Sequence, residues 1–166
     1  QSAYASALFM LLVIALTKCL AFLCAGIYES CLHTRTIDAL SGAHKVMPIT
    51  AYCFAVALAG LAGIPLLAGF MGKWLVFSSA ISIGDWIASA GLVIFLLSTL
   101  IGLGGYLPAL VKQFLPGTKT VNKTGMSAWW MKGPIMILSL FIIILGIFPT
   151  PVLSLVDWLV QWITIL

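Results

Sequence analysis

Two lysines lie inside long apolar stretches of this 166-residue chain, where charged side chains are rare. Lys18 has apolar residues on both sides for several helical turns, and Lys73 lies in the apolar segment 48–82. Placing an ammonium group in the hydrocarbon core costs about 3 kcal/mol on insertion scales, so such residues are functional candidates. Burial disfavours the charged form of a lysine, which allows its proton to come and go near neutral pH. We therefore predict proton or ion movement at Lys18 and Lys73.

A purely structural explanation for Lys18 is that its ammonium group reaches the membrane surface along its own stem. Lys18 lies roughly nine residues from the nearer expected helix end, which is about 14 Å at ~1.5 Å per residue. That distance exceeds a comfortable reach for the side chain. We therefore favour a functional role for Lys18 over simple anchoring.

The segment that carries Lys73 contains residues that interrupt helices. Four of them lie just before the lysine, at Gly63, Pro65, Gly69 and Gly72. A continuous helix over 48–82 would be about 50 Å long, whereas the hydrocarbon core is about 30 Å thick. Broken backbone persists in a membrane only where protein or a water-filled cavity satisfies its polar groups. We predict a discontinuous helix whose hinge, at these four residues, gives Lys73 room for water.

Glu29 is the third candidate for an ion pathway, because it ends the expected helix that carries Lys18. The competing interpretation is that Glu29 is a solvated interface charge. The same interpretation applies to the charged and imidazole residues of the following loop, which are His33, Arg35, Asp38 and His44.

Several classes of chemistry are not indicated by the sequence. It contains no nucleotide-binding motif, no nucleophile with a matching base, and no pair of carboxylates at helical spacing. The cysteines lack a CxxC pair and are interpreted as small apolar helix residues, at Cys19, Cys24, Cys31 and Cys53. We predict no catalytic centre, no metal site and no cofactor in this chain.

Composition defines the fold class. Hydrophobic residues make up 63% of the chain and charged residues 7%, against about 25% charged residues in soluble domains. We predict an all-α transmembrane protein with about four spanning helices, the second discontinuous, and an interfacial or bundle-packing terminal helix. The expected single membrane domain, 1–166, contains spans at about 3–28, 48–82 (broken near 63–72), 86–111 and 134–148, and a terminal helix at 152–166.

The expected loops carry the positive charge. Loops 30–47 and 112–132 hold Arg35, Lys45 and four further lysines, whereas the opposite loops hold no Lys or Arg. If the broken segment crosses once, both basic loops share one side, in accordance with the positive-inside rule. A re-entrant hairpin would put them on opposite sides. We predict a crossing segment with both basic loops facing the cytoplasm or matrix, and lipid rather than nucleic acid as the surrounding partner.

Three stretches carry a family resemblance. ALTKCLAFLCAG (15–26), MPITAYCF (47–54) and GIPLLAGFMGKW (63–74) resemble the antiporter-like subunits of respiratory complex I, Mrp-type cation/proton antiporters and energy-converting membrane-bound hydrogenases. The resemblance covers about residues 15–79. It identifies Lys18 with a lysine on the buried polar axis of that family, and Lys73 with the residue that terminates a proton half-channel at a helix break.

The resemblance implies a larger assembly. The chain corresponds to the C-terminal part of such a subunit, so the expected partners are other membrane subunits, including a chain that supplies the missing N-terminal spans. The implied function is translocation of protons, or Na⁺, in a redox-driven complex of a prokaryotic cytoplasmic or organellar inner membrane. Because the chain opens at Gln1, we expect a trimmed sequence, a fragment or one piece of a split protein.

Two alternatives remain open. The family commonly has histidines four and eight residues before its first lysine, where this chain has Ile14 and Met10. Those differences favour a degenerate subunit that braces the complex without conducting ions. The second alternative is part of an Mrp-type Na⁺/H⁺ antiporter without redox chemistry.

Overall fold

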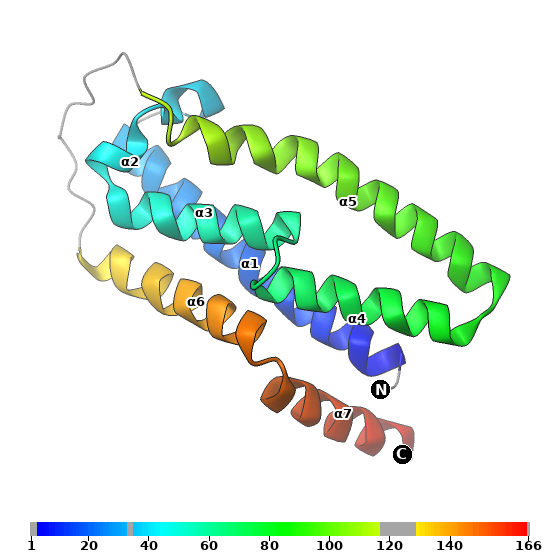
Figure 1. Cartoon of the computed structure of the whole chain (residues 1–166). Coiled ribbons are helices and arrows are strands. Elements are labelled where there is room, and N and C mark those ends of the chain that lie inside the picture. Colours follow the sequence, from blue (N-terminus) through cyan, green and yellow to red (C-terminus); the bar gives the residue numbers. More distant parts are fainter. Residues whose placement is uncertain (1–2, 33–34, 117–128, 166) are drawn as a thin grey trace.

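The structure is a computed structural model that describes residues 3–32, 35–116 and 129–165. Every regular element in these ranges is a helix, as predicted (Figure 1). The elements are α1 (Ala3–Leu32), the short 3₁₀ helix η1 (Ile37–Leu40), α2 (Ala43–Val46), α3 (Pro48–Ala62), α4 (Ala68–Ile83), α5 (Trp86–Lys112), α6 (Trp129–Ile147) and α7 (Thr150–Ile165).

Within the described residues, three helices are long and apolar enough to cross a membrane. They are α1, α5 and the part of α6 from Trp130 to Ile147. The apolar helices α3 and α4 are each shorter, and they follow one another across the interruption 63–67. The prediction of a discontinuous second segment is therefore confirmed, and the chain has an all-α membrane fold.

Helix α1 lies at the centre of the bundle. It contacts α3, α4, α6 and α7. In Figure 1, α3 and α4 follow one another along α1, α5 runs back along both of them, and α6 lies on the other side. Helix α7 continues beyond α6 towards the end of the bundle where α1 begins, so it packs on the bundle. In this arrangement α6 lies against one side of the interruption between α3 and α4, while Ile64, Pro65 and Leu66 stay exposed.

The core follows one side of α1. Its buried residues recur every three or four positions, as expected for one face of a helix, and include Phe9, Val13, Thr17, Leu20 and Cys24. The core continues into α3 and α6, with Cys53, Phe54, Ala57, Ile135, Ile142 and Leu145. Helix α5 contributes only Ala109 to the buried residues of the described chain, so most of its apolar surface is exposed.

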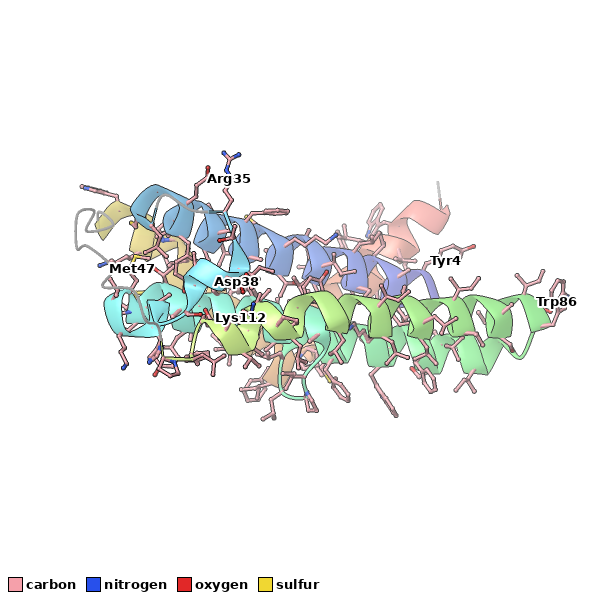
Figure 2. The ribbon with its side chains drawn as sticks, turned by 90° about the horizontal axis from the view of Figure 1, so that it is seen from above. Tyr4, Arg35, Asp38, Met47, Trp86 and Lys112 are labelled. Carbon is pink, nitrogen blue, oxygen red and sulfur yellow. The ribbon has the colours of Figure 1, made fainter. Side chains whose placement is uncertain are left out.

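The two ends of the bundle differ in chemistry (Figure 2). Arg35, Asp38 and Lys112 lie at one end, which we call the polar end. Tyr4 and Trp86 lie at the other, which we call the aromatic end, and both side chains are exposed. Lys112 forms an ion pair with Asp38, and Arg35 with Glu29. The loop charges therefore neutralise one another in part at the polar end.

Parts of both predicted loops lie outside the described residues, including His33, Lys119 and Lys123. Two helix boundaries also differ from the expected ones. Helix α1 runs to Leu32 rather than to Tyr28, and α6 begins at Trp129 rather than at Pro134. Both extensions consist of residues that hydropathy alone assigns to a loop.

Candidate functional site

The helix break begins at Gly63. Its φ angle is +85°, in the left-handed region that glycine adopts without steric cost. The Gly63 N–H donates to the carbonyl oxygens of Ala59 (3.0 Å) and Gly60 (3.1 Å), which ends α3 in a left-handed cap. Pro65 follows and has no N–H with which to continue a helix. Local sequence therefore determines where α3 ends.

The backbone of the break is strained at Leu66. This residue has a φ of +76°. Among the described residues, it is the only residue other than glycine whose φ is positive. For an L-residue with a side chain, that conformation costs roughly 1–2 kcal/mol. Such strain persists only where surrounding structure enforces it, and it is common at functional sites.

Lys73 joins the two halves of the broken segment. It lies in the second turn of α4, and its Nζ donates to the carbonyl oxygens of Leu61 (2.9 Å) and Ala62 (3.0 Å) at the end of α3. The last carbonyls of a helix lack partners within that helix and carry the negative end of its dipole. The half-buried ammonium group therefore satisfies backbone oxygens that the break has exposed.

The predicted hinge glycines all lie where chain segments approach closely. A Cβ at Gly63 would be 3.0 Å from Cδ and Nζ of Lys73, and a Cβ at Gly72 would be 2.7 Å from Sδ of Met10. A Cβ at Gly69 would overlap the carbonyl oxygen of Gly60. The start of α4 can lie against the end of α3, and against α1, because these side chains are absent.

Sequence reasoning missed Gly146, which brings α6 onto the break. A Cβ there would overlap the Leu66 carbonyl oxygen and would lie 2.6 Å from the Ala68 nitrogen. A signal was present: Ser139 and Gly146 are small residues seven positions apart in a span otherwise rich in Ile and Leu. In membranes such residues mark close helix contacts.

The site contains methionine where the family resemblance suggests histidine. Met10 is 7% exposed and packs against Gly72, next to Lys73 in the sequence. Ile14, the other departure from the family pattern, is half-buried. The contact between α1 and α4 beside Lys73 therefore has a thioether in place of an imidazole.

Lys18 lies on the outer side of α1. Its side chain is exposed, and it forms no hydrogen bond or ion pair with any residue that the structure describes. Its neighbour Thr17 points into the core, where its hydroxyl donates to the Val13 carbonyl. Within the described chain, the predicted pathway residues Lys18 and Lys73 are thus not brought together.

Glu29 also lies on the outer side of α1, about three turns beyond Lys18. Its Oε1 is 2.5 Å from Nη2 of Arg35 and accepts a hydrogen bond from Arg35 Nε at 2.7 Å. Both side chains are largely exposed. The structure therefore places Glu29 in a surface ion pair at the polar end.

A buried polar cluster at the polar end was not predicted. Tyr28 donates its hydroxyl hydrogen to Oε1 of Gln113 (3.2 Å), and Nδ1 of His44 lies 2.9 Å from the Gln113 carbonyl oxygen. Gln113 is fully buried, and its Nε2 has no partner among the described residues. The cluster ties α1 and α2 to the end of α5.

The other candidate ligands are dispersed. Across residues 3–32, 35–116 and 129–165, no three His, Cys, Asp or Glu side chains gather as a metal site would require. The cysteines are free thiols, with Cys24 and Cys53 buried in the core.

Comparison with known proteins identifies a matching family and several relatives. Residues 1–102 match the family described as NADH:quinone oxidoreductase/Mrp antiporter, TM. The chain is 34% identical over 128 residues to NADH-quinone oxidoreductase subunit N of Buchnera aphidicola subsp. Schizaphis graminum, an alignment that covers 74% of this chain and 26% of that relative. It is also 34% identical over 153 residues to subunit N of Bdellovibrio bacteriovorus, covering 90% of this chain and 30% of that protein.

Solved structures have the same fold. Respiratory complex I from Thermus thermophilus with bound aureothin contains a chain with a TM-score of 0.67 and 28% identity. The Mrp complex from Dietzia sp. DQ12-45-1b contains one with a TM-score of 0.76 and 22% identity, a likeness of fold alone. Each alignment covers 92% of this chain and 36% of the other.

The structure and the comparisons agree. The described residues form helices with a broken segment that carries a lysine, and the family match covers more than half of the sequence. The chain spans about a quarter to a third of the length of the relatives that it matches. It belongs to the NADH:quinone oxidoreductase/Mrp antiporter transmembrane family.

Proposed function

We propose that this chain is part of an antiporter-like subunit that moves protons, or Na⁺, across an energy-transducing membrane, with Lys73 as the exchange site. The supporting observation is that the Lys73 ammonium group bridges the break, bound to the carbonyl oxygens of Leu61 and Ala62. An ionisable group at a helix break in a membrane is a typical element of an ion path.

The chemistry of the contact suits reversible proton binding. A carbonyl oxygen accepts a hydrogen bond but holds no proton of its own, so the proton on Lys73 is not shared with a second acid. The ammonium form is the better donor and is held at the end of α3. After the proton leaves, the neutral amine is bound less tightly, and its lone pair can accept the next proton from water.

The remaining parts of the pathway lie outside the contact of α3 with α4. We propose that Lys18 is a relay lysine and that it connects to membrane subunits beyond these residues, including the segment that supplies the rest of the subunit. Supporting this, the chain covers only 26–36% of its relatives. A redox-driven complex agrees with the relatives named NADH-quinone oxidoreductase subunit N, and the Mrp complex supports a non-redox alternative by fold only.

A structural role is the second candidate, and the same contact supports it. An ammonium group that caps α3 stabilises the break whether or not it releases a proton. The thioether of Met10 beside Gly72 offers no proton-carrying group at that position. The chain would then brace the complex without conducting ions.

Substitution of Lys73 separates these two roles. Lys73→Arg keeps a cation that can bind the Leu61 and Ala62 carbonyls, but a guanidinium group does not release its proton in proteins. Lys73→Met removes both the cation and the cap. Transport would be measured in inverted membrane vesicles with a pH-sensitive dye, energised by NADH or by a Na⁺ gradient, and assembly by native electrophoresis.

If Lys73 is the exchange site, we expect the Lys73→Arg variant to assemble normally, while its coupled transport falls at least about tenfold. Lys73→Met should lose transport as well. Lys45→Met, which removes an exposed charge at the polar end, is the control and should transport normally. Normal transport by an assembled Lys73→Arg variant would contradict the exchange site and support the structural role.

A further inference from the structure

Two buried polar atoms near the polar end lack a hydrogen-bond partner among the described residues. They are Oγ1 of Thr50, which is 1% exposed, and Nε2 of Gln113, which is fully buried. Met47 and Lys112, which precede them in the sequence, lie at the same end of the bundle (Figure 2). An unpaired buried donor or acceptor is costly and therefore rare in folded proteins. Two of them in one region call for a common partner.

The side chain of Tyr28 links these two residues. Its ring packs edge-on against the ring of Phe54, with the ring centroids 5.5 Å apart. Thr50 lies one turn before Phe54, on the same face of α3. The hydroxyl of Tyr28 donates to Oε1 of Gln113 at 3.2 Å, and α3 packs against α5, the helix that Gln113 follows. The two unpaired atoms therefore flank one buried tyrosine.

The burial of these atoms does not depend on what surrounds the chain. Additional protein can only bury a surface further, and a side chain from outside cannot reach an atom that is already enclosed. The common partner must therefore be small enough to occupy the interior of the bundle.

The chemistry of the two atoms selects water as this partner. The amide nitrogen of Gln113 can only donate, whereas the hydroxyl oxygen of Thr50 can accept as well as donate. A metal cation would meet the amide hydrogens. An anion would enter without a free counter-charge from Lys112, which pairs with Asp38. Water donates and accepts at once, and buried water typically makes about three hydrogen bonds to groups of this kind.

We propose that ordered water is bound inside the polar end, where it accepts a hydrogen bond from Nε2 of Gln113 and donates one to Oγ1 of Thr50. The hydroxyl oxygen of Tyr28 can accept a further hydrogen bond from it. This water joins α1, α3 and α5 beneath the charged loops. The proposal concerns how these helices are held together, and it holds whether or not Lys73 exchanges ions.

Pulsed X-ray radiolysis of the intact complex tests for this water. The pulse converts water into hydroxyl radicals that react close to where they form, so a buried ring is oxidised where bound water touches it. Peptide mass spectrometry measures the oxygen added to each residue. Tyr28 is 2% exposed, and the reference is Phe9, which is 0% exposed and lies in the apolar core.

We expect Tyr28 to be oxidised several-fold faster than Phe9, after correction for the intrinsic reactivity of the two rings. This comparison needs no variant. Equal rates for the two residues would overturn the proposal.

Hydroxyl variants test whether Thr50 holds the water. Thr50→Val removes Oγ1 at nearly constant shape, and the oxidation rate of Tyr28 should fall several-fold, whereas Thr50→Ser should retain it. Thr17→Val is the matched control, because it removes a buried hydroxyl that already donates to the Val13 carbonyl within α1. An unchanged rate in Thr50→Val, or an equal fall in Thr17→Val, would contradict the proposed site.

A double-variant cycle provides an independent measurement. Gln113→Met removes the amide at similar volume, and thermal midpoints of the complex would be compared for this variant, Thr50→Val and the double variant. Water shared by two groups is lost when either group is removed, so the double variant should lower the midpoint by clearly less than the sum of the single shifts. Additive shifts would mean that no water links the two residues. Transport by Lys73 variants is read separately, so either proposal can fail alone.

Discussion

The Lys73 ammonium group is held by backbone oxygens rather than by an acidic side chain. Its two acceptors, the carbonyls of Leu61 and Ala62, are available only because α3 ends there. The function of this residue therefore depends on the shape of the backbone around it. Substitutions that alter the break without touching the lysine should affect the site as strongly as changes to the lysine itself.

Gly63→Ala tests that dependence. Alanine at a φ of +85° is strained by roughly 1–2 kcal/mol, and the new Cβ would press on Cδ and Nζ of Lys73 at 3.0 Å. We expect lower thermal stability of the purified complex in mild detergent and reduced transport.

Gly104→Ala is the matched control, because a Cβ there meets nothing within 4 Å and its φ is not positive. It should leave stability unchanged or raise it slightly, since alanine favours a helix by about 1 kcal/mol over glycine. Equal effects of the two substitutions would show that the backbone at Gly63 does not govern the site.

At the scale of single residues, the sequence predicted part of the site. Lys73 and the glycines near it could be identified from the sequence, because a charge and helix breakers contrast with apolar neighbours. The carbonyl acceptors were not, since every residue has a backbone oxygen and only the fold decides which ones lack partners. The positive φ of Leu66 was equally invisible, because leucine does not favour it.

At the scale of helices, the break is a joint against which a third helix packs. Helices α3 and α4 meet through Gly60 and Gly69, while α6 lies against the joint through Gly146. The sequence predicted the broken helix from its glycines and proline. It did not predict that α6 packs against the break, because hydropathy shows which faces avoid water but not which helices meet.

Gly146→Ala should force α6 away from the joint. Its Cβ would overlap backbone atoms of Leu66 and Leu67, and backbone cannot move aside as a flexible side chain does. Overpacking of this kind costs about 1–3 kcal/mol or more. We expect a clear fall in thermal stability and faster proteolysis near 63–67.

Gly133→Ala lies on the same helix, and its Cβ meets nothing within 4 Å of the described chain. It should be tolerated. If Gly146→Ala is tolerated equally well, α6 does not pack against the break.

For the whole molecule, the polar and aromatic ends lie at opposite ends of the bundle (Figure 2), and we expect them to face opposite sides of the membrane. The positive-inside rule assigns the polar end, which carries Arg35, Lys45 and Lys112, to the cytoplasm or matrix. The crossing formed by α3 and α4 allows both basic loops to share that side. The orientation is a prediction that follows from charge rather than from packing.

Single cysteines would test the orientation. In a background with Cys19→Ser and Cys31→Ser, Lys45→Cys lies near the polar end and Ser82→Cys near the aromatic end, both exposed. We expect a membrane-impermeant maleimide to label Lys45→Cys only in inverted vesicles and Ser82→Cys only in right-side-out ones. Labelling of both from one side would mean that the broken segment does not cross.

The contact of Lys73 with the end of α3 also links charge to shape. The ammonium group holds the start of α4 against the carbonyl oxygens of Leu61 and Ala62, and a neutral amine would hold them less tightly. Because α6 packs on the same joint through Gly146, a change of charge at Lys73 would loosen the fit between three helices at once. The joint would then convert a local electrostatic event into a mechanical one.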